Sequence, residues 1–203
     1  MVNNRITKPF SLKEKILRYL IENKGKPKTI LEISKALNAD YKNTFQAVKF
    51  LSNFIYKEKL GNTNMVEINF KPSQEIFAVE QKRTKEFLDK NKSLKLMQND
   101  ARDLNYPFFI VLIFGSYVKK ENTKNSDIDI CIISDNKLKT QELISKLRLL
   151  PEKLEIHDFN IKEFESMLDT KKENLAKEII KYNLILYGTE NYYNFVSKWM
   201  KRE

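Results

Sequence analysis

The stretch FGSYVKKENTKNSDIDICII, residues 114–133, places a charged pair inside an apolar run. Asp127 and Asp129 lie two residues apart at the start of a segment whose other residues are typical of a buried strand. Side chains at positions i and i+2 of a strand point to the same face, about 7 Å apart. Two carboxylates held this close repel each other and lose hydration if the face is packed. We therefore expect them to face water or a compensating positive charge.

A glycine and a serine precede this pair at the end of another apolar segment, FFIVLIF. Gly115 is one of only 4 glycines in the chain, so we expect it where the backbone conformation requires glycine. The pattern of Gly115-Ser116, ten residues and then D-x-D resembles the nucleotidyltransferase superfamily related to DNA polymerase beta. The SDIDI context is most similar to its minimal prokaryotic members, the MNT proteins. The resemblance covers about residues 95–190.

This resemblance implies transfer of a nucleoside monophosphate from a nucleoside triphosphate to an acceptor, with pyrophosphate leaving. Two Mg²⁺ ions about 3.5–4 Å apart stabilise the attacking and leaving oxygens in such reactions, and Mg²⁺ takes hard oxygen ligands. The resemblance assigns these ions to Asp127, Asp129 and a third carboxylate from a neighbouring strand. Glu155 in KLEIHDF is the first candidate, and Asp158, on the opposite strand parity, is the second. The predicted catalytic and metal-binding residues are therefore Asp127, Asp129 and Glu155.

The predicted nucleotide-binding residues are Gly115, Ser116, Lys119 and Lys120. A glycine in a strand-to-helix turn lets backbone N–H groups approach phosphate oxygens, and the serine hydroxyl adds a donor. By resemblance, relatives often have an Arg-Gly pair at the positions of Lys119 and Lys120. A simpler interpretation treats the two aspartates as a loop cap balanced by nearby lysines, but the combined spacing favours the nucleotide site.

The first third of the chain has a different character, with a strong excess of positive charge. Residues 1–70 contain 13 Lys and Arg against 6 Asp and Glu, which accounts for +7 of the total formal charge of +10. Capping-box patterns at Ser11 and Thr29 predict two helices, and a third is expected from about Tyr41 to Phe54 with Leu51 and Ser52 toward the core. Two strands joined by a turn at Gly61 and Asn62 follow.

This order of elements resembles the winged helix-turn-helix domains of prokaryotic DNA-binding regulators, over about 60 residues. The second helix of the helix-turn-helix pair enters the major groove in such domains. The resemblance and the basic charge predict contacts with double-stranded DNA. The predicted DNA-binding residues, at the start of the third helix and on the wing, are Tyr41, Lys42, Asn43, Thr44, Gln46, Lys57 and Lys59. The alternative is a winged helix used for dimerisation or protein contact.

The expected fold is α+β. It consists of a winged helix-turn-helix domain over residues 1–71, a linker helix over 72–92 and a small mixed-sheet nucleotidyltransferase domain over 93–203. The lone Cys131 is expected to be a small core residue, and Tyr192 and Tyr193 are expected to pack the last helix. No apolar stretch approaches the length of a membrane span, so we expect a cytoplasmic protein without a membrane partner.

Two functions agree with these patterns. The first is a Mg²⁺-dependent nucleotidyltransferase, targeted or regulated by a DNA-binding winged helix, whose acceptor is a protein hydroxyl, for example on a partner toxin, or a small molecule. The second is a DNA-binding regulator or antitoxin whose nucleotidyltransferase domain only binds nucleotide or a partner protein. A homodimer would suit palindromic DNA sites in either case.

Overall fold

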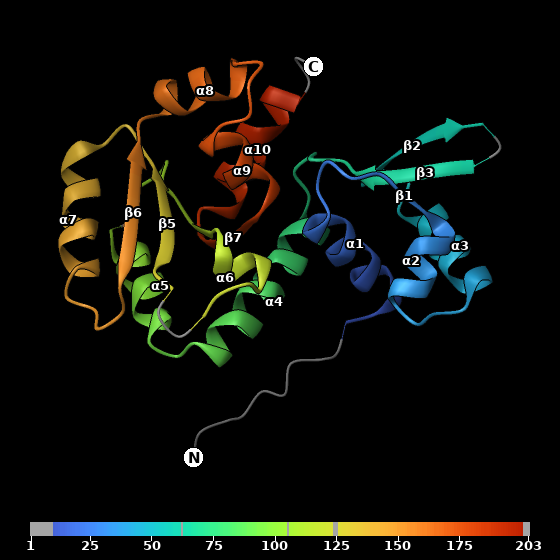
Figure 1. Ribbon diagram of the computed structural model, residues 1–203, viewed down its shortest axis with the longest axis horizontal. Helices are drawn as coiled ribbons and strands as arrows, with labels where there is room; N and C mark the ends of the chain where they lie inside the picture. Colours follow the sequence, from blue (N-terminus) through green and yellow to red (C-terminus); the bar gives the residue numbers. More distant parts are fainter. Residues whose placement is uncertain (1–9, 62, 105, 124–125, 201–203) are drawn as a thin grey trace. The chain divides into compact units, whose positions relative to one another are not determined.

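The computed structural model describes residues 10–200, apart from residues 62, 105 and 124–125 (Figure 1). Asn62, expected in a hairpin turn, lies outside the described residues. The chain forms two compact units, residues 1–69 and 70–203, each with helices and a sheet. The expectation of a mixed α+β protein is confirmed. Among the described residues, no helix is both long and apolar enough to span a membrane.

The first unit contains three helices and a small antiparallel sheet of order β1-β3-β2. Its elements, in chain order, are α1 (Leu12–Glu22), β1 (Lys28–Thr29), α2 (Ile30–Ala36), α3 (Tyr41–Phe50), β2 (Ile55–Leu60) and β3 (Thr63–Ile68). Both capping boxes form as predicted, with the Ser11 and Thr29 side chains accepting from Glu14 and Glu32 backbone N–H groups.

The third helix is shorter than predicted. It ends at Phe50, and residues 51–54 turn the chain toward β2. Leu51 is buried as expected, but Ser52 is exposed, so its assignment to the core was wrong. The physical reason is that a residue beyond the last helical turn no longer follows the helical period that faces the core.

The second unit is a four-stranded mixed sheet of order β6-β5-β4-β7 with helices on both faces. Its elements, in chain order, are α4 (Gln74–Lys90), α5 (Leu94–Asp103), β4 (Ile110–Phe114), α6 (Ser116–Lys119), β5 (Ile128–Ile133), α7 (Lys137–Leu147), β6 (Leu154–Phe159), α8 (Ile161–Asp169), α9 (Leu175–Lys181), β7 (Asn183–Tyr187) and α10 (Thr189–Met200). β4 is antiparallel to both of its neighbours, and β5 and β6 are parallel.

The alternation of side chains along β5 divides the core into two layers. Ile128, Ile130 and Ile132 pack with residues of α5 and α7 in one apolar cluster. Asp129 and Cys131 point to the other face, where α9 and α10 lie; Figure 1 shows α7 and the α9–α10 pair on opposite sides of β5 and β6. Cys131 is fully buried, and so are Tyr192 and Tyr193 of α10, which confirms their predicted core positions. Asp129 therefore lies at the end of a packed face.

The helix α4, which the sequence suggested as a linker, is part of the second unit. Its Glu80 and Arg83 form a buried ion pair, and the Tyr193 hydroxyl donates to Glu80 at 2.7 Å. Arg83 also donates to the carbonyl oxygen of Asn183 at 3.1 Å. Because buried charges are tolerated only when they are paired and hydrogen-bonded, this network holds α4 against β7 and α10.

Candidate active site

The site begins where β4 ends, at a turn that requires glycine. Gly115 has φ 67° and ψ −146°, a region that only glycine populates readily. A Cβ atom at this position would lie 1.9 Å from Oδ2 of Asp129, so the carboxylate fills the space beside the bare backbone. The backbone N–H of Ser116 acts on the same carboxylate and lowers the pKa of Asp129. Gly115 and the second aspartate of D-x-D are therefore in direct contact.

The third predicted carboxylate lies on the neighbouring parallel strand. Glu155 of β6 is the register partner of Asp129 of β5, so both side chains are on one face of the sheet. His157 follows two residues later on that face, and its Nε2 lies 3.2 Å from Oε1 of Glu155. Its ring also packs against Phe114 with centroids 5.6 Å apart. The Glu155 side chain is 59% exposed, so it can reach a ligand in solvent.

The surroundings of Asp129 disfavour its charged form. Burial raises the pKa of the Asp129 carboxyl, and the negative charge of Glu155 raises it further. His157 and the backbone N–H of Ser116 act in the opposite direction and lower the pKa of Asp129. A divalent cation or another positive charge beside Asp129 would therefore be stabilising, as expected from the two aspartates in the sequence.

Lys119 lies in α6 directly after the G-S turn. Its Nζ is 2.5 Å from Oε1 of Glu178 in α9 and 5.2 Å from the centre of the Tyr182 ring. The hydrogen bond with Glu178 raises the pKa of Lys119. Glu178 also contributes negative charge at Asp129, so it belongs to the same electrostatic environment.

Lys120 ends α6 in a left-handed conformation, with φ 61° and ψ 32°. This is the position of the glycine in the Arg-Gly pair that the resemblance implied. The backbone of this chain retains a conformation that glycine adopts freely although the residue is lysine. Lys120 is exposed, so its charge is available to a ligand near the turn.

Asp127 and Asp158, the other two acidic residues considered for the metal site, do not share the strand positions of Asp129 and Glu155. Asp127 is exposed and directly precedes β5. Asp158, the second candidate for the third carboxylate, pairs with Ile132 and so lies on the opposite face from Asp129. Within the described part of the chain, no three Asp, Glu, His or Cys side chains lie close enough to hold a metal ion together. The oxygen donors of Asp127, Asp129 and Glu155 nevertheless have the chemistry that Mg²⁺ prefers.

Most residues predicted to contact DNA are exposed on the first unit. Tyr41, Lys42, Asn43 and Gln46 are exposed on α3, and Lys57 and Lys59 are exposed on β2. Thr44 contradicts the prediction, because it is fully buried and its hydroxyl donates to the backbone oxygen of Asp40 at 2.8 Å. Its position in the helical period turns it toward the core together with Ala47 and Val48. Thr44 is therefore not part of an exposed surface.

Two comparisons with known proteins identify the family. Residues 105–192 match the family described as "Polymerase beta, Nucleotidyltransferase". A protein of Methanocaldococcus jannaschii, named as a protein adenylyltransferase, is 32% identical over 100 residues, which are 47% of this chain and 72% of that protein. The chain belongs to the polymerase beta nucleotidyltransferase family. It is a nucleotidyltransferase enzyme.

One solved structure is a partial match to this nucleotidyltransferase. It is described as the crystal structure of a toxin-antitoxin with AMP-PNP, with a TM-score of 0.35 and 24% sequence identity. The match covers 52% of this chain and 85% of that chain.

Sequence reasoning missed Glu178, which lies 59 residues beyond its partner Lys119. Within α9 it reads as one more charged residue on an amphipathic helix. No local signal distinguishes it, since its proximity to the G-S turn depends on the packing of α9 over the sheet.

Proposed function

We propose that this nucleotidyltransferase transfers AMP from ATP to a hydroxyl group of a protein, in a reaction that requires Mg²⁺. The observation that supports the proposal best is the contact of the G-S turn with Asp129, next to Glu155 in register. The name of the Methanocaldococcus jannaschii relative, a protein adenylyltransferase, supports both ATP as donor and protein as acceptor.

In the proposed reaction, the acceptor oxygen forms a bond to the α-phosphorus of ATP. The bond from the α-phosphorus to the α–β bridging oxygen breaks, pyrophosphate leaves, and the acceptor proton passes to the exposed carboxylate of Glu155. Ser116, Lys119 and Lys120 provide donors and positive charge for the triphosphate beside the Gly115 turn. Asp127, Asp129 and Glu155 would hold Mg²⁺, which supplies charge that stabilises the attacking and leaving oxygens.

The test is label transfer from each of the four nucleoside triphosphates, labelled at the α-phosphate, with Mg²⁺ and candidate acceptor proteins. Asp129→Asn should abolish transfer, because one oxygen ligand and one negative charge are lost. Asp103→Asn is the matched control, since Asp103 is an exposed carboxylate at the end of α5. Equal transfer by wild type and Asp129→Asn would contradict the proposed site.

We further propose that the first unit is a winged helix that binds double-stranded DNA. Its element order, the sheet order β1-β3-β2 and the β2–β3 hairpin support this assignment. The exposed residues Lys42, Lys57 and Lys59 and the net charge of +7 over residues 1–70 favour a polyanionic partner. DNA binding would direct or regulate the transfer reaction.

A second candidate role for this nucleotidyltransferase is regulation through DNA binding alone. The exposed basic residues of the first unit favour it independently of the catalytic site. The two functions separate experimentally: salt-sensitive DNA binding that persists in Asp129→Asn, although that variant transfers no label, would support a regulatory role that does not depend on transfer.

A further inference from the structure

The two edge strands of the four-stranded sheet, β7 and β6, differ in how their outer backbone groups are covered. At the β7 edge, side chains of α4 and α5 occupy the backbone acceptors of the strand. Arg83 donates to the carbonyl oxygen of Asn183, Thr84 to that of Ile185 and Gln98 to that of Leu186. An edge covered in this way cannot accept another strand.

The β6 edge is open within the described part of the chain, where β5 is the one strand paired with β6. The N–H of Ile128 donates to the carbonyl oxygen of Lys153, and the N–H of Ser134 donates to the carbonyl oxygen of Phe159. The backbone N–H and C=O groups of the odd-numbered residues from 153 to 159 therefore point toward β5. Backbone groups alternate in direction along a strand, and Leu154, Ile156 and Asp158 therefore direct N–H and C=O outward. Unpaired backbone groups in a row form a template for an extended chain.

This open edge lies directly beside the catalytic carboxylates. Glu155 is on β6 itself, and its register partner is Asp129. A strand added at about 4.8 Å from β6 would place every second side chain on the same face as Glu155. A hydroxyl-bearing residue in such a strand would therefore approach the carboxylate that we propose as its proton acceptor.

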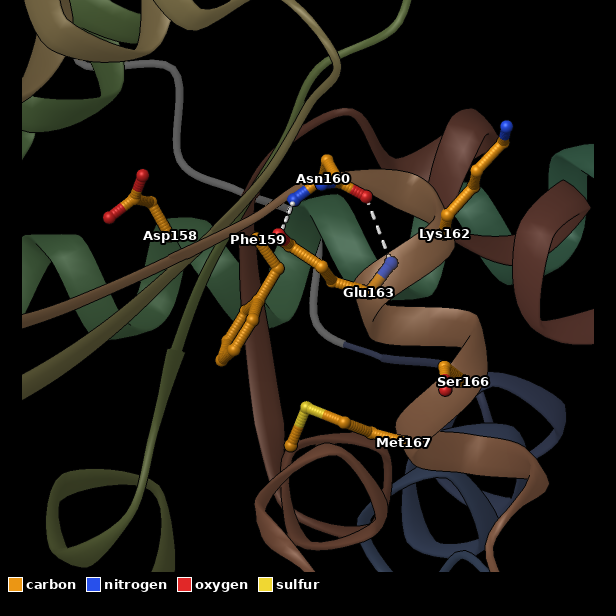
Figure 2. A pocket seen from close by; sticks show the side chains of 7 residues that line it. All are labelled: Asp158, Phe159, Asn160, Lys162, Glu163, Ser166 and Met167. Carbon is orange, nitrogen blue, oxygen red and sulfur yellow. Dashed lines mark hydrogen bonds between the residues drawn. The ribbon is translucent and has the colours of Figure 1, made fainter.

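A surface pocket continues the edge where β6 ends. It has a volume of about 710 Å³ and lies between the end of β6 and α8. Figure 2 shows the Phe159 ring and the Met167 side chain pointing toward the same space, while the Lys162 amino group extends away from it. Two hydrogen bonds of 2.9 Å between Asn160 and Glu163 hold the start of α8 in place. Phe159 and Met167 thus give the pocket an apolar surface, surrounded by polar residues, that a side chain of an extended ligand can contact.

We propose that the acceptor protein binds as an extended segment along the β6 edge, adding a strand to the sheet and carrying its hydroxyl to Glu155. The segment runs from Glu155 toward the pocket at Phe159 and Met167, about four residues or 13 Å along the strand. The inference rests on the proposed transfer to a protein hydroxyl, because the edge leads to the catalytic face. Main-chain hydrogen bonds supply the affinity and the pocket supplies selectivity.

The decisive variant is Asp158→Pro, because proline removes an outward N–H without removing a bond to β5. Asp158→Ala is its matched control, since it removes the same exposed carboxylate and keeps the N–H. The probe is a set of ten-residue peptide pools, each with one central Ser, Thr or Tyr in random proline-free flanks. Nuclear magnetic resonance on the ¹⁵N-labelled full chain follows the Leu154, Ile156 and Asp158 amides without ATP, and label transfer from ATP is measured separately.

The pools should shift the outward amides and slow their hydrogen exchange, with the largest change next to Glu155. Asp158→Pro should lower peptide labelling about tenfold relative to Asp158→Ala, at unchanged ATP affinity. Wild-type outward amides that do not respond to any pool overturn the proposal, whether or not Asp158→Pro folds. Amide protection without label transfer overturns the proposed function and leaves the docking edge standing. Protection that rises with protein concentration alone, together with a dimer by light scattering, overturns it in favour of pairing between two copies.

Discussion

The carboxylate of Asp129 occupies the space that a Cβ atom of residue 115 would need, with Oδ2 only 1.9 Å from that position. The first prediction follows from this contact. Gly115→Ala should lower the free energy of unfolding by about 1–3 kcal/mol, because alanine at φ 67° and ψ −146° is strained and displaces Asp129. Transfer should fall by about 100-fold or more, since small misplacements of catalytic groups are costly.

Gly25→Ala is the control for this substitution in denaturant unfolding and label transfer. Gly25 has a similar φ of 70°, but a Cβ atom there would meet nothing within 4 Å. It should lose stability from the backbone conformation alone and leave transfer unchanged. An equal loss of transfer in both variants would show that Asp129 does not depend on the missing Cβ.

The second prediction concerns stability and pH. The raised pKa of Asp129 means that its ionised form is less favourable in the folded than in the unfolded chain. The contribution of the neutral acid is therefore fully present below the unfolded pKa and is lost as pH rises through the folded pKa. Asp129→Asn should melt at a higher temperature than wild type near pH 7 and at the same temperature near pH 3. A difference that is largest in acid would show that the sign is wrong.

The third prediction separates binding from stability at Lys119. Both side chains of the pair with Glu178 are partly exposed, so Lys119→Ala should change the free energy of unfolding by less than about 1 kcal/mol. Affinity for ATP with Mg²⁺ should fall about tenfold in calorimetric titrations, because one charged donor to the phosphates is lost. Lys146→Ala, which breaks a comparable pair with Glu142 on α7, should bind ATP like wild type.

The fourth prediction concerns the left-handed residue after the turn. Lys120→Gly should raise the free energy of unfolding by about 1 kcal/mol, because glycine adopts φ 61° without the Cβ penalty. Asn38→Gly tests the same effect at φ 47° and should give a smaller gain, since asparagine tolerates this region better than lysine. Thermal and denaturant unfolding of both variants measure the difference. A loss of stability in Lys120→Gly would mean that the lysine side chain has a structural role.

The fifth prediction tests the proposed DNA surface. Replacing Lys57 and Lys59 together by alanine should weaken duplex DNA binding and reduce the slope of log affinity against log salt by about 2. Thr44→Val should leave that slope unchanged, because Thr44 is buried and bonded to its own helix. Fluorescence anisotropy at several salt concentrations measures both. If the slope of log affinity against log salt is the same in the double lysine variant and in wild type, Lys57 and Lys59 do not contact the DNA.

Local patterns predicted much of the architecture. The capping patterns at Ser11 and Thr29 predicted two helix starts correctly. Each cap depends only on one side chain and the backbone N–H three residues later, so the local sequence is sufficient to predict it. The G-S and D-x-D spacing identified the family, and the apolar runs of β4 and β5 are buried as expected. The strand β1 was missed, since two residues are too few to show a period.

The amino-acid sequence by itself determined the nucleotidyltransferase family and where most helices and strands begin, since these depend on residue type and on neighbours a few positions away. Only the tertiary structure decided that Glu155 is the register partner of Asp129, that Glu178 forms an ion pair with Lys119 and that Thr44 is buried. Strand register and helix packing bring together residues tens of positions apart through burial of the whole core, and no short window of sequence contains that information.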